Sequence, residues 1–115
     1  MTTPAPPYTP IVRAGDWLVV SGQLGLADGK LVDGGTAAQA RQALVNLAAV
    51  LDGEGASLSD VVKTTVFLRH MDDYDAMNEV YAVAFGDHRP ARSAIAVAGL
   101  PRGGLVEIEA WAVVS

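Results

Sequence analysis

The segment at residues 105–114 constrains the fold most, because its alternation predicts a β-strand with two largely apolar faces. One face is entirely apolar and consists of Val106, Ile108, Ala110, Ala112 and Val114. The other face mixes large apolar residues with two carboxylates: Leu105, Glu107, Glu109, Trp111 and Val113. A face left to solvent is normally polar. We therefore expect the first face to pack under helices and the second to pack against another subunit, with its charges partly desolvated in a cleft.

A second strand, predicted at residues 92–98, repeats this arrangement. One face of this strand carries Ser93, Ile95 and Val97. The other face carries Arg92 and three alanines, Ala94, Ala96 and Ala98. We expect Arg92 and Glu107 to share the face that meets another subunit. A desolvated charge costs free energy unless it is paired or used. Two interpretations stay open here: an ion pair that holds an oligomer together, or a site where Arg92 binds a ligand carboxylate and a glutamate accepts a proton from water.

Length and composition favour a small domain that associates. The 115 residues correspond to one domain, residues 1–115, and 50% of them are hydrophobic while 18% are charged, which excludes intrinsic disorder. A domain of this size buries only about two-thirds of the surface of its unfolded chain. We therefore expect an oligomer to cover the remaining apolar surface. Residues 1–10 contain four of the six prolines and predict an extended N-terminal arm.

The rest of the chain predicts an α+β fold. The elements before the last two strands are expected, in chain order, as strands at 11–14 and 17–21, a helix at 36–51, a strand at 61–68 and a helix at 71–85. Their order is typical of a mixed β-sheet with two helices on one face.

Three local patterns add detail to these elements. The spacing Thr36-x-x-Gln39 predicts a capping box at the start of the first helix. Alternation in the strand at 61–68 predicts one face made of Val62, Thr64, Val66 and Leu68. Helical spacing in the second helix predicts a stripe of core residues: Tyr74, Met77, Tyr81 and Phe85.

Charge and residue usage exclude several classes of function. The net charge is −5 and only eight residues are lysine or arginine, which disfavours nucleic acid as a partner. The chain has no cysteine, so disulfides and thiolate chemistry are excluded. No apolar run approaches the roughly 20 residues that cross a bilayer, and residues 1–10 lack the features of a signal peptide. We expect a cytoplasmic protein with no membrane partner.

Other polar residues form no site that the sequence alone identifies. Ser21 has no apparent histidine partner, so a hydrogen-bonding or turn role is favoured over that of a nucleophile. His70, near Asp72 and Asp73, lacks the spacing of a metal site and predicts a surface loop. Arg102 is interpreted as a solvated loop charge.

Motifs spread over nearly the whole chain resemble the RidA/YjgF family of reactive-intermediate deaminases. The most specific are Pro90-Ala-Arg-Ser-Ala-Ile-Ala-Val-Ala-Gly-Leu-Pro101 and Leu105-Val-Glu-Ile-Glu-Ala110. Four further segments are similar to the family's pattern: residues 20–23, 38–44, 61–68 and 77–81.

The resemblance implies a chorismate-mutase-like α+β fold assembled as a homotrimer, with sites in the clefts between subunits. It implies hydrolysis of small imino acids and enamines, such as 2-iminopropanoate and 2-iminobutanoate, to 2-keto acids and ammonia, with no metal or organic cofactor. The family's carboxylate-binding arginine matches Arg92 and its water-orienting glutamate matches Glu107. Its other cleft positions match Tyr8 of the arm, Ser21, Gly22 and Asn78.

One position departs from the family's pattern. Archetypal deaminases often have cysteine two residues beyond the arginine, where this chain has Ala94. If the cleft uses only the backbone there, alanine preserves it; if it uses the thiol, activity or substrate preference changes. The loop at residues 86–89 is also shorter than in the archetype. These departures motivate two alternatives: a trimeric protein that binds small carboxylates without turnover or has a regulatory role, and a deaminase of a pathway-specific enamine such as an aminoacrylate.

Overall fold

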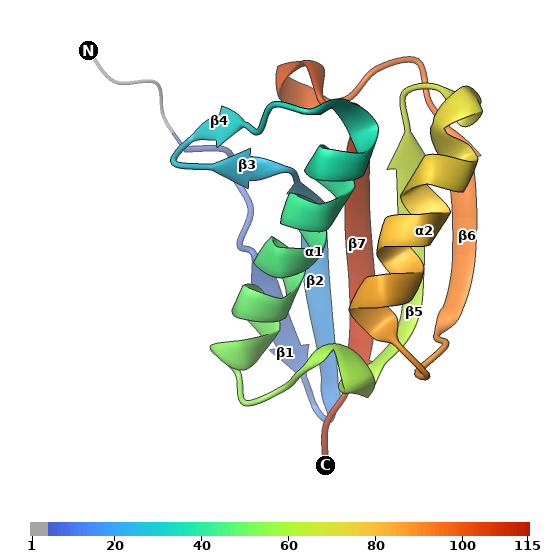
Figure 1. The fold of residues 1–115 in the computed structure, drawn as a ribbon. Coiled ribbons are helices and arrows are strands. Elements are labelled where there is room, and N and C mark those ends of the chain that lie inside the picture. The colour runs from blue at the N-terminus through green and yellow to red at the C-terminus, as the bar shows by residue number, and fades with distance from the viewer. Residues whose placement is uncertain (1–4) are drawn as a thin grey trace.

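A five-stranded mixed sheet lies behind two helices in the computed structural model, which describes residues 5–115 (Figure 1). The strands are arranged across the sheet in the order β1 (Ile11–Ala14), β2 (Trp17–Leu24), β7 (Val106–Val113), β5 (Val61–Leu68) and β6 (Ala91–Ala96). β6 pairs with β5 in parallel, and the other neighbours are antiparallel. Helices α1 (Gly35–Asp52) and α2 (Tyr74–Phe85) cover the same face, which confirms the predicted α+β arrangement.

The remaining segments are short. β3 (Leu26–Ala27) and β4 (Lys30–Leu31) form a two-stranded hairpin, and single turns of 3₁₀-helix occupy Leu58–Asp60, Met71–Asp73 and Pro101–Gly103. Residues 5–10 of the predicted arm form no helix or strand, whereas residues 1–4 of that arm lie outside the described residues. No helix in the described part of the chain is long and apolar enough to cross a membrane.

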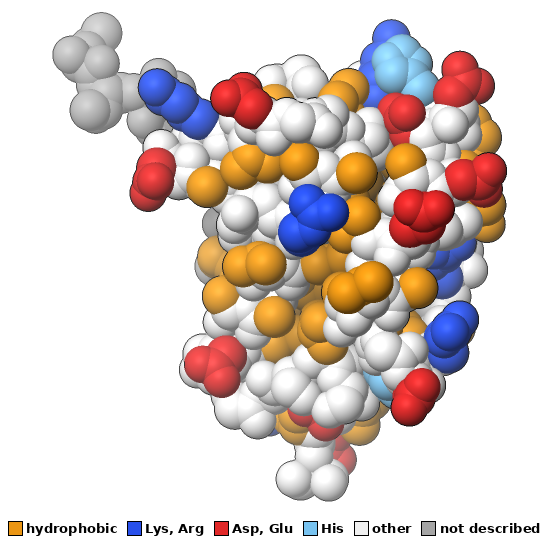
Figure 2. Space-filling model, in the orientation of Figure 1, with side chains coloured by type: hydrophobic (Ala, Val, Ile, Leu, Met, Phe, Trp, Pro, Cys, Tyr) orange, Lys and Arg blue, Asp and Glu red, His pale blue; other side chains and the backbone are white. Residues whose placement is uncertain are grey.

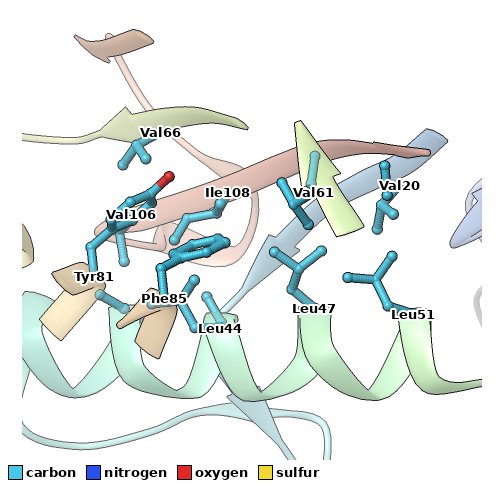
Figure 3. Packing of buried hydrophobic residues seen from close by; sticks show 14 of the residues in the cluster. Val20, Leu44, Leu47, Leu51, Val61, Val66, Tyr81, Phe85, Val106 and Ile108 are labelled. Carbon is cyan, nitrogen blue, oxygen red and sulfur yellow. The ribbon is translucent and has the colours of Figure 1, made fainter. Parts of the chain in front are cut away.

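The core lies between the helices and the sheet (Figure 3). Leu44, Leu47 and Leu51 of α1 point toward the sheet, where they meet residues of β2, β5 and β7. The predicted apolar face of the last strand is confirmed over the length of β7, because Val106, Ile108, Ala110 and Ala112 are fully buried. Burying each large aliphatic side chain stabilises the fold by about 1.5–3 kcal/mol.

The predicted capping box at Thr36 and Gln39 is wrong. α1 begins at Gly35, after Gly34 in a left-handed conformation, so Thr36 lies inside the first turn and cannot cap it. The Thr36 hydroxyl instead donates to Asp73 Oδ2 at 2.7 Å, and Gln39 Oε1 accepts from the Leu105 N–H at 2.9 Å. Both side chains join α1 to other parts of the fold.

The predicted faces of two elements need correction at one residue each. The register of β5 against β7 shifts between Val61 and Lys63, so Val61 is buried and Val62 is exposed, contrary to the predicted alternation. In α2, Met77, Tyr81 and Phe85 are buried as predicted, but Tyr74 is 37% exposed. Tyr74 is the first residue of α2 and extends beyond the core toward the edge strand β6, where it contacts Arg92.

Candidate active site

An irregularity in β2 creates a pocket at its end. The pairing of β2 with β7 shifts between Val20 and Gln23, so Ser21 and Gly22 form a β-bulge, a device that redirects side chains and often lies beside active sites. The bulge borders an open pocket of about 350 Å³ lined by Tyr8, Ser21, Gly22, Pro101, Glu107 and Glu109. Four of the residues predicted as site residues, Tyr8, Ser21, Gly22 and Glu107, therefore come together.

Gly22 lets the Glu107 side chain occupy this pocket. A Cβ atom on residue 22 would lie 2.6 Å from Glu107 Cδ and 2.9 Å from Glu107 Oε2, well inside contact distance. The Glu107 carboxyl group therefore packs directly over the Gly22 backbone. The bulge and the missing side chain act together to place one carboxylate at a defined point.

The surroundings of Glu107 disfavour its charged form. The side chain is half-buried on the face of β7 that points away from the helices. Burial raises the pKa of Glu107 above its usual value, and the nearby Glu109 carboxylate raises that pKa further. A carboxylate with a raised pKa holds a proton more readily, which suits a group that takes a proton from water and passes it on.

Arg92 lies on the other face of the sheet. It pairs across the parallel ladder with Thr64, which is fully buried and shares a 2.7 Å hydrogen bond with the Tyr81 hydroxyl. Since paired residues project to the same side, Arg92 points toward the helices, whereas Glu107 points away from them. The prediction that Arg92 and Glu107 share one face is therefore wrong.

Contacts with α2 hold the guanidinium of Arg92. Arg92 Nη2 donates to the Tyr74 hydroxyl at 3.2 Å, and Nη1 lies 3.7 Å from Met77 Sδ. The guanidinium carbon is 4.8 Å from the Tyr81 ring centre and 5.6 Å from that of Tyr74, which are cation–π distances. Because β6 is an edge strand, this charge stands at the rim of the sheet.

Two more predicted site residues belong with Arg92. Ala94 follows it on the same face of β6 and packs partly against the core. Asn78 lies one helical turn after Tyr74 on α2, and Asn78 Oδ1 is the one buried side-chain polar atom among the described residues without a hydrogen-bond partner. A buried acceptor without a donor is costly, so the unpartnered Asn78 Oδ1 is an exception within the described residues.

Sequence reasoning missed Pro101 and the tyrosine partners of Arg92. Pro101 lines the pocket from the loop before β7; it ends the family motif at residues 90–101, but nothing in the sequence assigned it a role in the site. Arg102 is exposed, as predicted for a loop charge, and its Nη1 donates to the Gly29 carbonyl at 2.6 Å, which joins that loop to the β3–β4 turn. No cluster of three potential metal-ligating side chains occurs within residues 5–115.

A larger groove lies away from all of these residues. It has a volume of about 510 Å³ between α1 and α2, where hydrophobic side chains gather on the surface (Figure 2). Its lining is apolar except for Arg41 and Glu79. The smaller pocket at Glu107 is the better candidate site, because it combines carboxylates, a hydroxyl and an aromatic side chain at a backbone irregularity.

A comparison with known families identifies the chain. The model of the family described as Endoribonuclease L-PSP matches residues 2–114. The chain belongs to this family. A curated relative, the 2-iminobutanoate/2-iminopropanoate deaminase of Mus musculus, is 47% identical over 118 residues, covering 97% of this chain and 87% of the relative. A RutC family protein of Pyrococcus horikoshii is 45% identical over 95% of this chain and 88% of its own.

A solved structure agrees with this L-PSP assignment. RidA from the Antarctic bacterium Psychrobacter sp. superposes with a TM-score of 0.92 at 38% identity, covering 97% of this chain and 92% of that one. The resemblance to the RidA/YjgF family is confirmed.

Proposed function

We propose that this L-PSP family protein hydrolyses small 2-imino acids and their enamine tautomers, such as 2-iminopropanoate and 2-iminobutanoate, to 2-keto acids and ammonia. The observation that carries the proposal is the half-buried Glu107 carboxyl, placed over Gly22 in a pocket with an aromatic wall. The 2-iminobutanoate/2-iminopropanoate deaminase of Mus musculus, which matches nearly the whole chain, supports the choice of substrate class.

The proposed reaction needs placement of the substrate more than a strong nucleophile, because an iminium carbon is already electrophilic. Arg92 binds the substrate carboxylate through a two-bond fork, and each charge-assisted hydrogen bond contributes about 1.5–3 kcal/mol. Glu107 accepts a proton from water as the water oxygen bonds to the C=N carbon, and the proton then passes to nitrogen. The C–N bond of the carbinolamine breaks, and ammonia and a 2-keto acid leave.

The proposed site requires more than one copy of the chain. Arg92 and Ala94 lie on the helix side of the edge strand β6 and Asn78 lies on α2, whereas Tyr8, Ser21, Gly22 and Glu107 line the pocket on the open side. We propose a homotrimer of chorismate-mutase-like protomers in which the β6 edge of one copy faces the pocket of its neighbour. Asn78 would accept a hydrogen bond there, and Tyr8, Ser21, Gly22 and the Ala94 backbone would line the substrate.

Exposed apolar residues support this assembly. Trp17 and Trp111 pack edge to face with ring centroids 6.1 Å apart, yet each is 44% exposed on the open face of the sheet. Ile95 and Val113 on the same face are 46% and 36% exposed. An apolar surface of this kind marks a protein–protein contact.

The proposal is tested by generating imines next to the protein. An amino-acid oxidase or dehydratase supplies fresh imine, and loss of the trapped imine signal is followed for several amino acids. Faster loss with the parent protein than with Glu107→Gln supports the deaminase. Equal rates with and without the parent protein would refute it.

The absence of the family cysteine at Ala94 favours one alternative, a trimer that binds small carboxylates without turnover. This alternative predicts that the parent protein binds a 2-keto acid and that Arg92→Ala abolishes this binding. It also predicts that the parent protein does not raise the rate of imine loss above background. We do not propose RNA cleavage, although the family description mentions it, because a net charge of −5 and a pocket with two carboxylates repel phosphates. A cytoplasmic location stays a prediction from the sequence.

A further inference from the structure

The N-terminal arm is attached to the body of the protein at one residue. Ser21 donates its backbone N–H to the Pro10 carbonyl at 2.9 Å and its hydroxyl to the Thr9 carbonyl at 2.6 Å. In the described part of the chain, no other hydrogen bond joins residues 5–10 to the body. The Tyr8 side chain, which lines the Glu107 pocket, is 63% exposed. The backbone N–H of Tyr8 donates only to the Pro6 carbonyl within the arm.

All the polar groups of Ser21 already have partners. Its carbonyl accepts from Gln23 Nε2 at 3.1 Å, in addition to the two bonds that it donates to the arm. A serine hydroxyl has one proton to donate, and a carbonyl such as that of Thr9 can only accept. The Ser21 hydroxyl therefore has no proton left for a ligand in the pocket.

We propose that Ser21 is a positioning residue, which fixes the arm so that Tyr8 forms one wall of the Glu107 pocket, and that it donates no hydrogen bond to substrate. This inference rests on the proposed function for its effect on catalysis. Pro7 and Pro10 stiffen the arm on both sides of Tyr8. An anchor at Thr9 therefore restricts where the tyrosine ring can lie.

A double-mutant cycle separates this role from direct substrate contact. Ser21→Ala lowers kcat/KM for 2-iminopropanoate by about fivefold, the loss of one neutral hydrogen bond. In a Tyr8→Ala background, the same substitution lowers kcat/KM by less than about twofold, because the wall that it positions is already gone. Ser21→Thr, which keeps a hydroxyl, restores most of the activity. Ser59→Ala, a serine in the Leu58–Asp60 turn, serves as the matched control.

A measurement on the free protein reports on the arm without any substrate. The three tyrosines, labelled with fluorotyrosine, give three ¹⁹F signals. In Ser21→Ala the Tyr8 signal moves to the position of free tyrosine, whereas those of Tyr74 and Tyr81 stay in place. Ser59→Ala leaves all three unchanged.

Two results would overturn the inference. One is a Tyr8 ¹⁹F signal that does not move in Ser21→Ala. The other is a double variant whose loss in kcat/KM equals the product of the losses in Ser21→Ala and Tyr8→Ala. If the parent protein does not hydrolyse imines, the proposed function fails, and the ¹⁹F signal still decides whether Ser21 fixes the arm.

Discussion

Arg92 and Glu107 lie on opposite faces of the same β-sheet, Arg92 against the tyrosines of α2 and Glu107 over Gly22 on the open side. The two groups that the proposed reaction needs therefore cannot meet within one protomer. The proposed activity therefore requires the proposed assembly of several copies, and this requirement leads to the first prediction.

Two inactive variants should restore each other when subunits are mixed. Arg92→Ala and Glu107→Gln are each inactive as pure oligomers, because every site lacks one group. After unfolding and refolding together in equal amounts, about a quarter of the sites between subunits receive both native residues, so about a quarter of the parent activity returns. Rates of imine hydrolysis before and after mixing measure this. Activity that returns without any exchange of subunits would contradict the arrangement. A mixture that stays inactive after complete exchange would contradict it as well.

Replacing arginine by lysine at position 92 should remove most activity. An ammonium group cannot reproduce the planar two-bond contact with a carboxylate, so Arg92→Lys lowers kcat/KM by about 100-fold, the loss of one charge-assisted hydrogen bond. Steady-state kinetics with 2-iminopropanoate test this. Arg13→Lys, which changes an exposed guanidinium bonded to the Glu54 carbonyl, is the control and keeps full activity. A fully active Arg92→Lys enzyme would exclude the proposed role.

A methyl group at position 22 should affect activity more than folding. The added Cβ would meet the end of a flexible glutamate side chain, which can move aside at little cost to the fold. Gly22→Ala therefore shifts the thermal midpoint by only a few degrees. The displaced Glu107 carboxyl lowers kcat by about 100-fold. Gly99→Ala, where a Cβ would contact nothing within 4 Å, is the matched control. An equal loss of kcat in Gly22→Ala and Gly99→Ala would argue against a specific effect on Glu107.

The pH profile should depend on Glu109. Glu107 acts in its ionised form, so kcat/KM falls as the pH drops through the raised pKa of Glu107. Removing the neighbouring charge in Glu109→Gln lowers the pKa of Glu107, and the acid limb of the profile moves to lower pH. The pKa read from the acid limb stays above the usual pKa of glutamate, because burial, the larger cause of the raised pKa, remains. A limb that moves to higher pH, or does not move, would disprove this coupling.

The raised pKa of Glu107 also predicts how the stability of the protein depends on pH. A carboxyl whose pKa is higher in the folded than in the unfolded chain favours folding below the unfolded pKa, and that contribution is lost as the pH rises through the folded pKa. Glu107→Gln should therefore raise stability at neutral pH relative to the parent protein and leave it little changed in acid. Urea unfolding at several pH values, with fixed protein concentration, measures the difference. A Glu107→Gln protein less stable than the parent at neutral pH would contradict it.

Patterns within single elements predicted the structure well. The alternation in residues 105–114 correctly placed Ile108 in the core and Glu107 and Trp111 on the open face. Such patterns are local, because neighbouring side chains in a strand must point to opposite sides. Errors arose where the chain leaves the regular repeat, as at the bulge beside Val62, or where a helix begins one residue early, as at Gly35.

Relations between elements were harder to predict. The pocket depends on a bulge at Ser21 and Gly22 that no spacing in the sequence announces. The contacts of Arg92 with Tyr74 and Tyr81 depend on β6 lying beside β5 at the edge of the sheet. Both follow from the pairing of strands far apart in the chain.

The sequence by itself determined approximately where the two helices and the five strands of the main sheet lie, that the last strand has two largely apolar faces, and which family motifs the chain carries. Only the tertiary structure decided which side of the sheet each charge occupies and which residues surround it. The reason is that alternation sets the relative faces within one strand, whereas the face that meets the helices depends on strand order and on register, both of which arise from long-range pairing.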